Sequence, residues 1–569
     1  MPILEWLSQY RFAWLRDDLI AGLTVWAVMV PTALAYTGIA GVPAVVGLYT
    51  IPLALLAYAV FGTSRALVVG PDSATALLSA HTVSALMAQH SGDYGALTSS
   101  LALLVGVLFC SFGVLRMGWI AHFISQPVMK GFIQGLALVT MMSQLPKLFG
   151  VENVGGNFFQ AVWALFQQGP NTHLPTLGVG LGSLVLLFAL SYFFPKSPAA
   201  LITVVAAILA VSCFDLHEQG VAIVGVIETG IPPFGLPHFQ SADAIGLLQG
   251  ALAIVLLNYA ESLGTAKAAA LITGGSLNPN QELVGLGMAN LGSSLSSGFV
   301  VAGSLSQSAV SMTAGGKTQM AALFHTVFII LTLLFLMPLF KNLPEAALGV
   351  IVIKAMIQML DFGYLKQLRV VSYSEFSLAL VVYVGVLALG VLPGIGLGVV
   401  FSLIALIYHA AHPGTAILGK VHGKDMYRNV LRRADAKTLP GLLIFRLDSD
   451  LFFINADYCA ERIRHHVAAA AEPVCEVLID AETINRIDMT ATDMLSKLHT
   501  ELAQKNTTLS MARVRDSVRV LLKQTEVEQR IGSDHIYDSI TQGVKAFCQR
   551  TGVPLPQDEN KVAGSAAGE

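Results

Sequence analysis

The sequence predicts a mostly helical membrane protein that ends in a soluble α/β domain, and three observations support this prediction. Charged residues make up only 12% of the 569 residues, whereas soluble globular domains carry roughly 25%. The mean hydropathy is +0.67. About fourteen apolar runs, many close to the roughly 20 residues that cross a bilayer, occupy the first part of the chain, and the charge density rises sharply from about residue 413.

The apolar runs set the domain organisation. They cover residues 18–37, 45–61, 71–89, 98–115, 124–146, 174–194, 197–214, 245–271, 282–298, 304–314, 317–339, 343–359, 371–390 and 392–410. Several are too short or too interrupted to cross a hydrocarbon core of about 30 Å alone. We therefore expect a transmembrane domain over 1–412, a linker at 413–435, an α/β domain at 436–553 and a disordered tail at 554–569.

The charges between the apolar runs predict the orientation in the membrane. Lys and Arg fall in alternate gaps, beginning with Arg16, Arg65 and Arg116, whereas the long 215–243 loop has four acids and no Lys or Arg. Because loops rich in Lys and Arg stay on the cytoplasmic side, both termini and the α/β domain are expected in the cytoplasm. The expected location is the inner (plasma) membrane, with several passes.

Composition also narrows the class of function. The formal net charge of -3 indicates no nucleic-acid partner. Five scattered cysteines without a CxxC pair indicate neither a disulfide framework nor a metal site. No nucleophile–base pair or Gly-rich phosphate loop stands out in the sequence, so we expect no enzyme activity and no cofactor.

A stretch poor in large apolar residues interrupts the membrane pattern. Residues 300–319 read VVAGSLSQSAVSMTAGGKTQ, and Lys317 is their only formal charge. The octet GSLSQSAV, which starts at Gly303, resembles GPDSATAL, which starts at Gly70, because both follow a Val-Val run and place hydroxyls two residues apart. Paired interrupted segments in the two halves of a membrane protein are the best sequence sign of a transporter's binding site.

Such a stretch suits an extended run that becomes a helix inside the bilayer. The first N–H groups of that helix lack partners, and its N-terminus carries about half a positive charge. Two such ends that face each other can hold an anion without a basic side chain. We expect the extended residues 300–303 to lead into a half-helix from Ser304, and Pro71 to begin the other half-helix. The alternative is close helix packing on small residues.

One acid lies inside a long apolar segment. Glu261 stands in LLNYAESLGTAKAAA, and Thr265 follows one helical turn later on the same face. A charged carboxylate is costly at that depth, so Glu261 is expected to carry a proton near neutral pH. We predict that Glu261 and Thr265 handle the coupling ion. The alternative is a structural role for Glu261, either in an ion pair or as a carboxyl hydrogen-bonded to the small-residue segments.

These motifs resemble the sulphate permease (SulP) anion transporters over nearly the whole chain. The matching stretches are RDDLIAGLTV (16–25), GLYT (47–50), FGTSRALVVGP (61–71), QPVMKGFIQGLAL from Gln126, AESLGTAK (260–267) and the run from Asn280 to Thr318. They are similar, in this order, to the start of the family's first helix, its two-part signature, its fifth helix, its eighth-helix acid and its ninth and tenth helices.

The resemblance implies fourteen segments in two inverted repeats of seven, in the uracil-permease-type fold. A core domain of segments 1–4 and 8–11 would hold the substrate between half-helices 3 and 10. It would move as an elevator against a gate domain of segments 5–7 and 12–14, which would also supply much of a homodimer contact. The substrate-binding residues implied on this chain are Thr32, Ser73, Thr75, Gly303, Ser304, Leu305, Ser306 and Gln307.

Two positions depart from the family pattern. Gln307 stands where the family often has Arg, and Thr32, after Pro31, stands where it often has Gln. Without a fixed positive charge, the half-helix dipoles must hold the anion more alone. Members with Glu at the position of Glu261 resemble proton-coupled symporters, but Thr265 keeps the sodium coupling of bicarbonate carriers open.

The C-terminal region resembles a STAS domain. PGLLIFRLDSDLFFINADYCAERIRHHV from Pro440 and CEVLIDAETINRIDMTATDML from Cys475 alternate strand and helix. Soluble STAS proteins carry a switch serine after an Asp, whereas Met489 follows Asp488 here, which excludes phosphorylation at that position. Thr490 is expected to cap a helix. Support of folding, trafficking or dimerisation is the favoured role, and nucleotide binding is not favoured.

The sequence therefore predicts a secondary transporter of a small anion, with proton-coupled sulphate uptake as the first choice. The expected partners are the anion, a proton or sodium ion, the lipid bilayer and a second copy of the chain. The alternatives are a sodium-coupled bicarbonate carrier, a C4-dicarboxylate symporter, an uncoupled anion channel and a membrane-anchored regulator that acts through its STAS domain.

Overall fold

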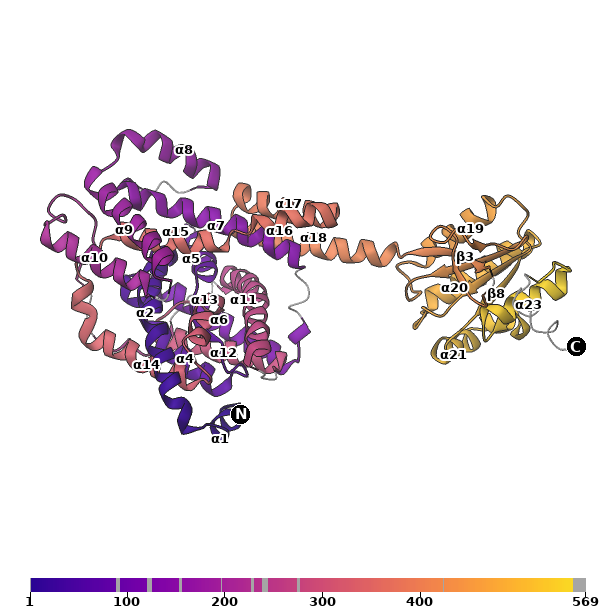
Figure 1. The fold of residues 1–569 in the computed structure, drawn as a ribbon, viewed down its shortest axis with the longest axis horizontal. Helices are drawn as coiled ribbons and strands as arrows, with labels where there is room; N and C mark the ends of the chain where they lie inside the picture. Colours follow the sequence, from indigo (N-terminus) through magenta and orange to yellow (C-terminus); the bar gives the residue numbers. More distant parts are fainter. Residues whose placement is uncertain are drawn as a thin grey trace, which may run out of the picture. The chain divides into compact units, whose positions relative to one another are not determined.

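The computed structural model describes residues 2–88, 93–119, 125–152, 156–195, 197–226, 230–237, 244–273, 277–422 and 424–555. The chain forms two compact units, Met1–Ser402 and Leu403–Glu569, and the division falls inside one long helix. Figure 1 traces both units along the chain. The predicted tail lies almost wholly outside the described residues.

The first unit is helical except for two short strands. Its elements are α1 (Pro2–Ser8), α2 (Leu15–Ala40), α3 (Ala44–Tyr49), α4 (Ile51–Phe61), β1 (Val68–Pro71), α5 (Ser73–Met87), α6 (Tyr94–Val114), α7 (Gln126–Phe149), α8 (Phe158–Gln168), α9 (Leu174–Phe193), α10 (Ala199–Cys213), α11 (Ala244–Thr273), α12 (Pro279–Leu295), β2 (Val301–Ser304), α13 (Leu305–Thr313), α14 (Met320–Leu331), α15 (Glu345–Met359), α16 (Phe362–Val371), α17 (Tyr373–Leu389) and α18 (Val391–Ala411).

Each of the fourteen predicted apolar segments contains a helix at the expected place. The two interrupted segments contain a four-residue strand followed by a helix, as the half-helix pattern predicts. Among the described residues, seven helices are long and apolar enough to cross a membrane. The mostly helical fold with a C-terminal α/β unit is confirmed, and the number of fourteen spans stays a prediction.

The helices of the first unit pack in two sets. One set contains α2, α4, α5, α6, α11, α12, α13 and α14, and the other contains α7, α8, α9, α10, α15 and α17. The two sets meet where α2 packs on α10 and α15, and where α5 packs on α7. Both interrupted segments belong to the first set, so the strands and their helices share one packing environment.

The second unit corrects the expected linker. Residues 413–435 contain β3 (Thr415–Val421) and β4 (Tyr427–Asn429), and both strands join the domain's sheet. The remaining strands are β5 (Ala436–Lys437), β6 (Leu442–Leu447), β7 (Glu476–Asp480), β8 (Thr508–Ala512) and β9 (Ile536–Tyr537). β3 is defined by its pairing with β4, β5 and β6, and local composition does not show such pairing.

The sheet has the order β4-β3-β6-β7-β8-β9, with β5 also paired to β3. Strands β6 to β9 run parallel, and β3 runs antiparallel to β6. The connecting helices are α19 (Ala456–Ala468), α20 (Met489–Gln504), α21 (Asp516–Gln524), α22 (Val527–Ile531) and α23 (Ile540–Thr551).

Helices cover both faces of this sheet because side chains alternate along each strand. Leu443, Phe445 and Leu447 of β6 join the core formed with α19, α20, α21 and α22. Leu442 and Ile444 point to the other face and join the core formed with α23. This is the two-sided burial that a mainly parallel sheet requires.

The structure also corrects the predicted cap of α20. Asp488 is the N-cap, and its carboxylate accepts the N–H of Ala491 at 2.9 Å. The same carboxylate accepts the N–H of Phe453 at 2.8 Å. Thr490 therefore lies one residue inside the helix rather than at its cap, and Met489 is exposed on the first turn.

Candidate anion site at two half-helices

Two strands that are far apart in the sequence bring the half-helices together. β1 pairs antiparallel with β2, with Val69 opposite Gly303 and Gly70 opposite Ala302. Pro71 is the last residue of β1, opposite Val301, so it ends the strand rather than beginning the helix as predicted. The ladder satisfies backbone groups that would otherwise be unpaired at this depth.

Three polar side chains of neighbouring helices complete the hydrogen bonding of β2. The amide of Asn290 accepts the N–H of Val301 at 3.0 Å and donates to the carbonyl of Val301 at 3.1 Å. Asn258 also donates to that carbonyl, at 2.7 Å. The hydroxyl of Ser262 accepts the N–H of Gly303 at 2.8 Å and donates to Asn258 Oδ1 at 2.8 Å.

This network is not predicted by the sequence. The sequence does not single out Asn258 or Ser262, and it assigns no hydrogen-bond partner to Asn290. All three are fully buried, and a polar side chain inside an apolar helix is the signal that could have found them. The backbone N–H of Gly303, one of the predicted substrate-binding residues, already donates to Ser262.

The two half-helices have different caps. Asp72 caps α5 and accepts the N–H of Ala74 at 2.9 Å. Ser304 caps α13 and accepts the N–H of Gln307 at 3.4 Å. The caps shift the predicted alignment of the two octets by one residue, so that Gln307, at the third helical position of α13, matches Thr75 rather than Ala74. A negative cap offsets the positive end of α5, whereas a neutral cap leaves the end of α13 electropositive.

The predicted residues at the start of α13 differ in exposure and in hydrogen bonding. Ser306 is exposed, and Leu305 is 58% exposed. Ser304 is buried, and its hydroxyl lies 3.3 Å from that of Ser306. Gln307 is 3% exposed, and its Oε1 atom has no hydrogen-bond partner within the described parts of the chain. The tip of α13 therefore offers both an exposed hydroxyl residue, Ser306, and the buried amide of Gln307.

Gln307 lies against the first strand. A methyl group built on Gly70 would come 3.5 Å from Gln307 Oε1 and 2.7 Å from Met29 Cε. Gly70 therefore allows both side chains to approach the backbone of β1 closely.

The other predicted hydroxyls are already bonded. Thr32 donates to the carbonyls of Val28 and Met29 in its own helix, at 3.0 and 3.1 Å. Thr75 donates to the carbonyl of Asp72 at 3.2 Å. Ser73 is buried, with Met359 Sδ 4.0 Å from its hydroxyl. The hydroxyls of Thr32 and Thr75 are therefore engaged by backbone carbonyls one turn or less away in the chain.

The predicted coupling residues both lie on α11. Thr265 is buried, and Glu261 is half-buried. The carboxyls of Glu261 and Asp72 are close enough for their charges to interact, and Tyr36 lies within range of both. α11 packs directly on β2 and on α5, so the acid of one segment and the cap of another face the same region.

A second buried acid, which the sequence does not single out, anchors the loop that leads into β1. Glu282 of α12 is 1% exposed. Its carboxylate accepts hydrogen bonds from the hydroxyls of Tyr58 and Thr63 at 2.8 and 2.5 Å, and from the N–H groups of Thr63 and Ser64 at 3.1 and 2.7 Å. Four donors on one buried carboxylate fix residues 63–64 relative to α12.

Asp18 of α2 is a buried acid that anchors the loop following α13. Its fully buried carboxylate accepts the N–H groups of Lys317 and Thr318 at 2.7 and 3.2 Å, and the hydroxyl of Thr318 at 2.7 Å. The Lys317 ammonium pairs with Asp17 at 3.2 Å. Within the described residues, no cluster of three His, Cys, Asp or Glu side chains could hold a metal ion.

Comparison with known proteins supports the same architecture. The sequence profile of the Sulfate permease family matches residues 15–382, and that of the STAS domain matches residues 433–543. The chain is 34% identical to "Probable sulfate transporter MT1781" of Mycobacterium tuberculosis, over 96% of this chain and 98% of that protein. It is 30% identical to "Sulfate transporter 4.1, chloroplastic" of Arabidopsis thaliana, over 96% and 82% of the two chains.

Solved structures resemble the fold as well. The structure of SLC26A9 matches with a TM-score of 0.87 at 21% identity, over 97% of this chain and 93% of that chain. The transmembrane domain of the cyanobacterial bicarbonate transporter BicA matches with a TM-score of 0.60 at 25% identity, over 70% and 98% of the two chains. This chain belongs to the sulfate permease family of anion transporters and carries a C-terminal STAS domain.

Proposed function

We propose that the protein is a secondary active transporter that takes up sulfate together with protons. The single observation that carries the proposal is the antiparallel pairing of β1 with β2, because it fixes the N-terminal ends of α5 and α13 at the two ends of one four-residue ladder inside the helical unit. The names of the Mycobacterium and Arabidopsis relatives supply the choice of sulfate.

The anion is proposed to bind closer to α13 than to α5. Asp72 places a carboxylate on the α5 end, whereas Ser304 leaves the α13 end without a negative charge. Ser306 would donate its hydroxyl, and the buried amide of Gln307 would donate through Nε2 while its Oε1 accepts a hydrogen bond from a water. Thr32, Ser73, Thr75 and Leu305 would shape the walls.

Proton coupling is proposed at Glu261. Two negative charges on Glu261 and Asp72 would repel each other and a bound anion, because their charges interact directly. A proton taken up by Glu261 removes part of that repulsion, so anion and proton binding would favour each other. Thr265 would orient the acid.

Movement of the core against the gate is proposed as the transport step. The helices pack in two sets, and the site with both strands belongs to one of them. The set with α7, α9, α10, α15 and α17 would stay fixed and would contribute the homodimer contact. Both termini and the STAS domain are proposed to lie in the cytoplasm, below the inner membrane.

A sodium-coupled bicarbonate carrier is the second candidate function. The solved structure of BicA, a bicarbonate transporter by its title, matches the fold with a TM-score of 0.60. Thr265, one turn from Glu261, would then supply an oxygen ligand for sodium. A C4-dicarboxylate symporter or an uncoupled channel would use the same half-helix ends.

Uptake by proteoliposomes tests these functions against each other. Purified full-length protein would be tested with radiolabelled sulfate, bicarbonate and succinate under an imposed proton gradient, an imposed sodium gradient or neither. Sulfate accumulation that requires the inward proton gradient is expected. Sodium-driven bicarbonate accumulation would favour the second candidate, and currents without accumulation under any gradient would point to a channel.

A further inference from the structure

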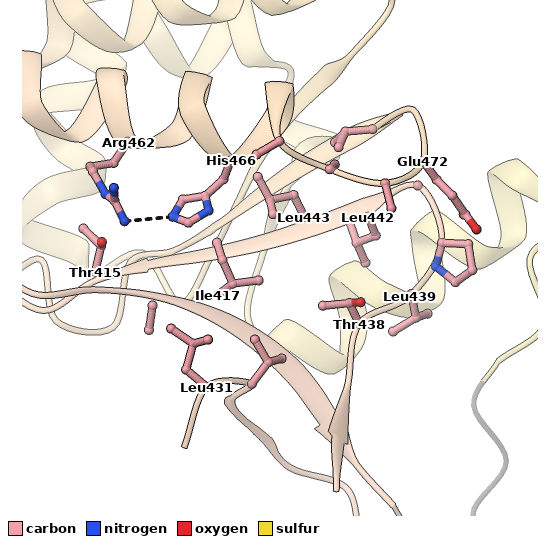
Figure 2. Close-up of a pocket in the computed structure, with 18 residues that line it drawn as sticks. Thr415, Ile417, Leu431, Thr438, Leu439, Leu442, Leu443, Arg462, His466 and Glu472 are labelled. Carbon is pink, nitrogen blue, oxygen red and sulfur yellow. Dashed lines mark hydrogen bonds between the residues drawn. The ribbon is translucent and has the colours of Figure 1, made fainter. Parts of the chain in front are cut away.

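A cavity of about 550 Å³ opens in the STAS domain, away from the strand-paired site. It lies between β3, the start of β6, the segment around residues 438–441 and the end of α19, and all its lining residues belong to the second unit. Figure 2 shows this pocket. Its volume falls in the range of small-molecule sites, which is about 300–1,000 Å³.

One face of α19 supplies the polar end of the cavity. Arg462, His466 and Ala469 all line it, and their spacing of four and three residues places them on the same side of a helix. Figure 2 shows the side chains of Arg462 and His466 next to each other, with Glu472 at the other end of the pocket. Between them the lining is mainly apolar and includes Ile417 and Leu443.

His466 orients the guanidinium of Arg462. An Arg462 NH2 group donates to His466 Nε2 at 3.2 Å. Burial first, and the charge of Arg462 second, lower the pKa of His466, so its ring is neutral at pH 7 and can accept this bond. The Nε atom of Arg462 is buried and has no hydrogen-bond partner in the described part of the chain. A fixed guanidinium with an unused donor is suited to a planar anion.

We propose that this cavity binds a monocarboxylate with an apolar body, with Arg462 holding the carboxylate and the apolar lining, including Ile417, Leu431 and Leu443, holding the body. Leu431 is 92% exposed on the wall of the cavity, and a ligand that covers it would remove apolar surface from water. The site would let the cytoplasmic domain sense an organic acid independently of the transported anion.

The charges of the cavity argue against a nucleotide. Its lining has one guanidinium, and Glu472 adds a negative charge at the opposite end. The several negative charges of a di- or triphosphate would meet that carboxylate. Phosphate groups commonly bind to backbone N–H groups at a helix N-terminus. This cavity is lined instead by residues from the last turns of α19.

Calorimetric titration of the full-length protein in lipid nanodiscs tests the proposal, with 4-phenylbutanoate as the probe and empty nanodiscs as the blank. Saturable binding is expected for the wild type, and 4-phenylbutan-1-ol, which lacks the carboxylate, should bind at least about tenfold more weakly. Arg462→Gln should weaken binding of the acid at least about tenfold. Arg464→Gln is the matched control, because Arg464 lies on α19 but pairs with Glu501 outside the cavity.

A second variant tests the cavity without substituting Arg462, so that a local folding defect at Arg462 cannot account for the result. Ile417 is half-buried, so Ile417→Trp should fill the cavity and abolish binding while leaving Arg462 in place. Absence of saturable binding to the wild type, or equal binding by Arg462→Gln, would overturn the proposal. Displacement of the probe by ATP, with ATP binding that depends on Arg462, would also overturn it in favour of a phosphate site.

Discussion

The carboxylate of Glu282 in α12 accepts a hydrogen bond from the hydroxyl of Tyr58 in α4 at 2.8 Å, and both side chains are fully buried. This contact joins two helices of the set that carries both strands. The same carboxylate holds Thr63 and Ser64, which begin the loop into β1. An acid that the sequence pattern does not single out thus fixes the approach to the first half-helix.

Glu282→Ala should lower the free energy of unfolding by about 3 kcal/mol, because four buried donors lose their acceptor. Thermal unfolding of the purified protein in detergent would measure the change in Tm. Glu218→Ala, at an exposed loop position, is the control and should leave Tm unchanged. A Tm for Glu282→Ala equal to that of the control would contradict the role of the carboxylate as an anchor.

Gly131→Ala should force α7 and α17 apart at their contact and so destabilise the protein. A methyl group at this position would come 2.2 Å from the backbone oxygen of Ala379, and backbone cannot move aside cheaply. We expect a loss of about 1–3 kcal/mol of stability. Gly178→Ala in α9 is the matched control, since nothing lies within 4 Å of its added methyl. Both changes gain the same helix propensity, so equal Tm values for the two variants would refute the packing argument.

Ser306→Leu should block the accessible tip of α13. Ser306 is exposed at the first turn, and a larger apolar side chain would cover the helix end that is proposed to bind the anion. KM for uptake should rise at least about tenfold, which corresponds to roughly 1.4 kcal/mol. Thr313→Val, at the other end of α13, removes a hydroxyl bonded only within its own helix and should leave KM alone. An unchanged KM in Ser306→Leu would place the site elsewhere.

Glu261→Gln should separate binding from coupling. The amide cannot release a proton, so uptake driven by a proton gradient should fall at least about tenfold, whereas exchange of labelled for unlabelled anion without a gradient should persist. Proteoliposome uptake with and without an imposed gradient measures both rates, with Glu218→Gln as the control. Full gradient-driven uptake by Glu261→Gln would remove this residue from the coupling step.

Cysteine labelling should distinguish a buried thiol of the STAS domain from an exposed one. Burial raises the pKa of the Cys459 thiol to about 12, so almost no thiolate is present at pH 7.5. Cys475 is exposed. A short maleimide treatment of the folded protein, followed by peptide mass mapping, should modify Cys475 and spare Cys459, and denaturation before treatment should expose both. Rapid labelling of Cys459 in the folded chain would show that α19 does not hold this thiol in the core against the sheet.

Features that depend on local composition could be predicted from the amino-acid sequence alone. Apolar runs located the helices, because burial in lipid requires long stretches without charge wherever they occur in the chain. The Gly-, Ser- and Thr-rich runs located the two interrupted segments, because an extended run cannot be formed from large apolar residues facing lipid. The motifs from Arg16 to Thr318 were sufficient to indicate the family.

Which distant groups meet was decided by the folding of the chain in three dimensions. Several contacts join segments far apart in the chain. They are the register that places Gly303 opposite Val69, the hydrogen bond from Asn258 to Val301, the anchoring of residues 63–64 by Glu282 and the membership of β3 in the STAS sheet. Such pairings depend on how the backbone donors and acceptors of one segment are satisfied by another. A single sequence shows which side chains are present, but not which groups they contact. For that reason Pro71 was expected in a helix and lies in a strand.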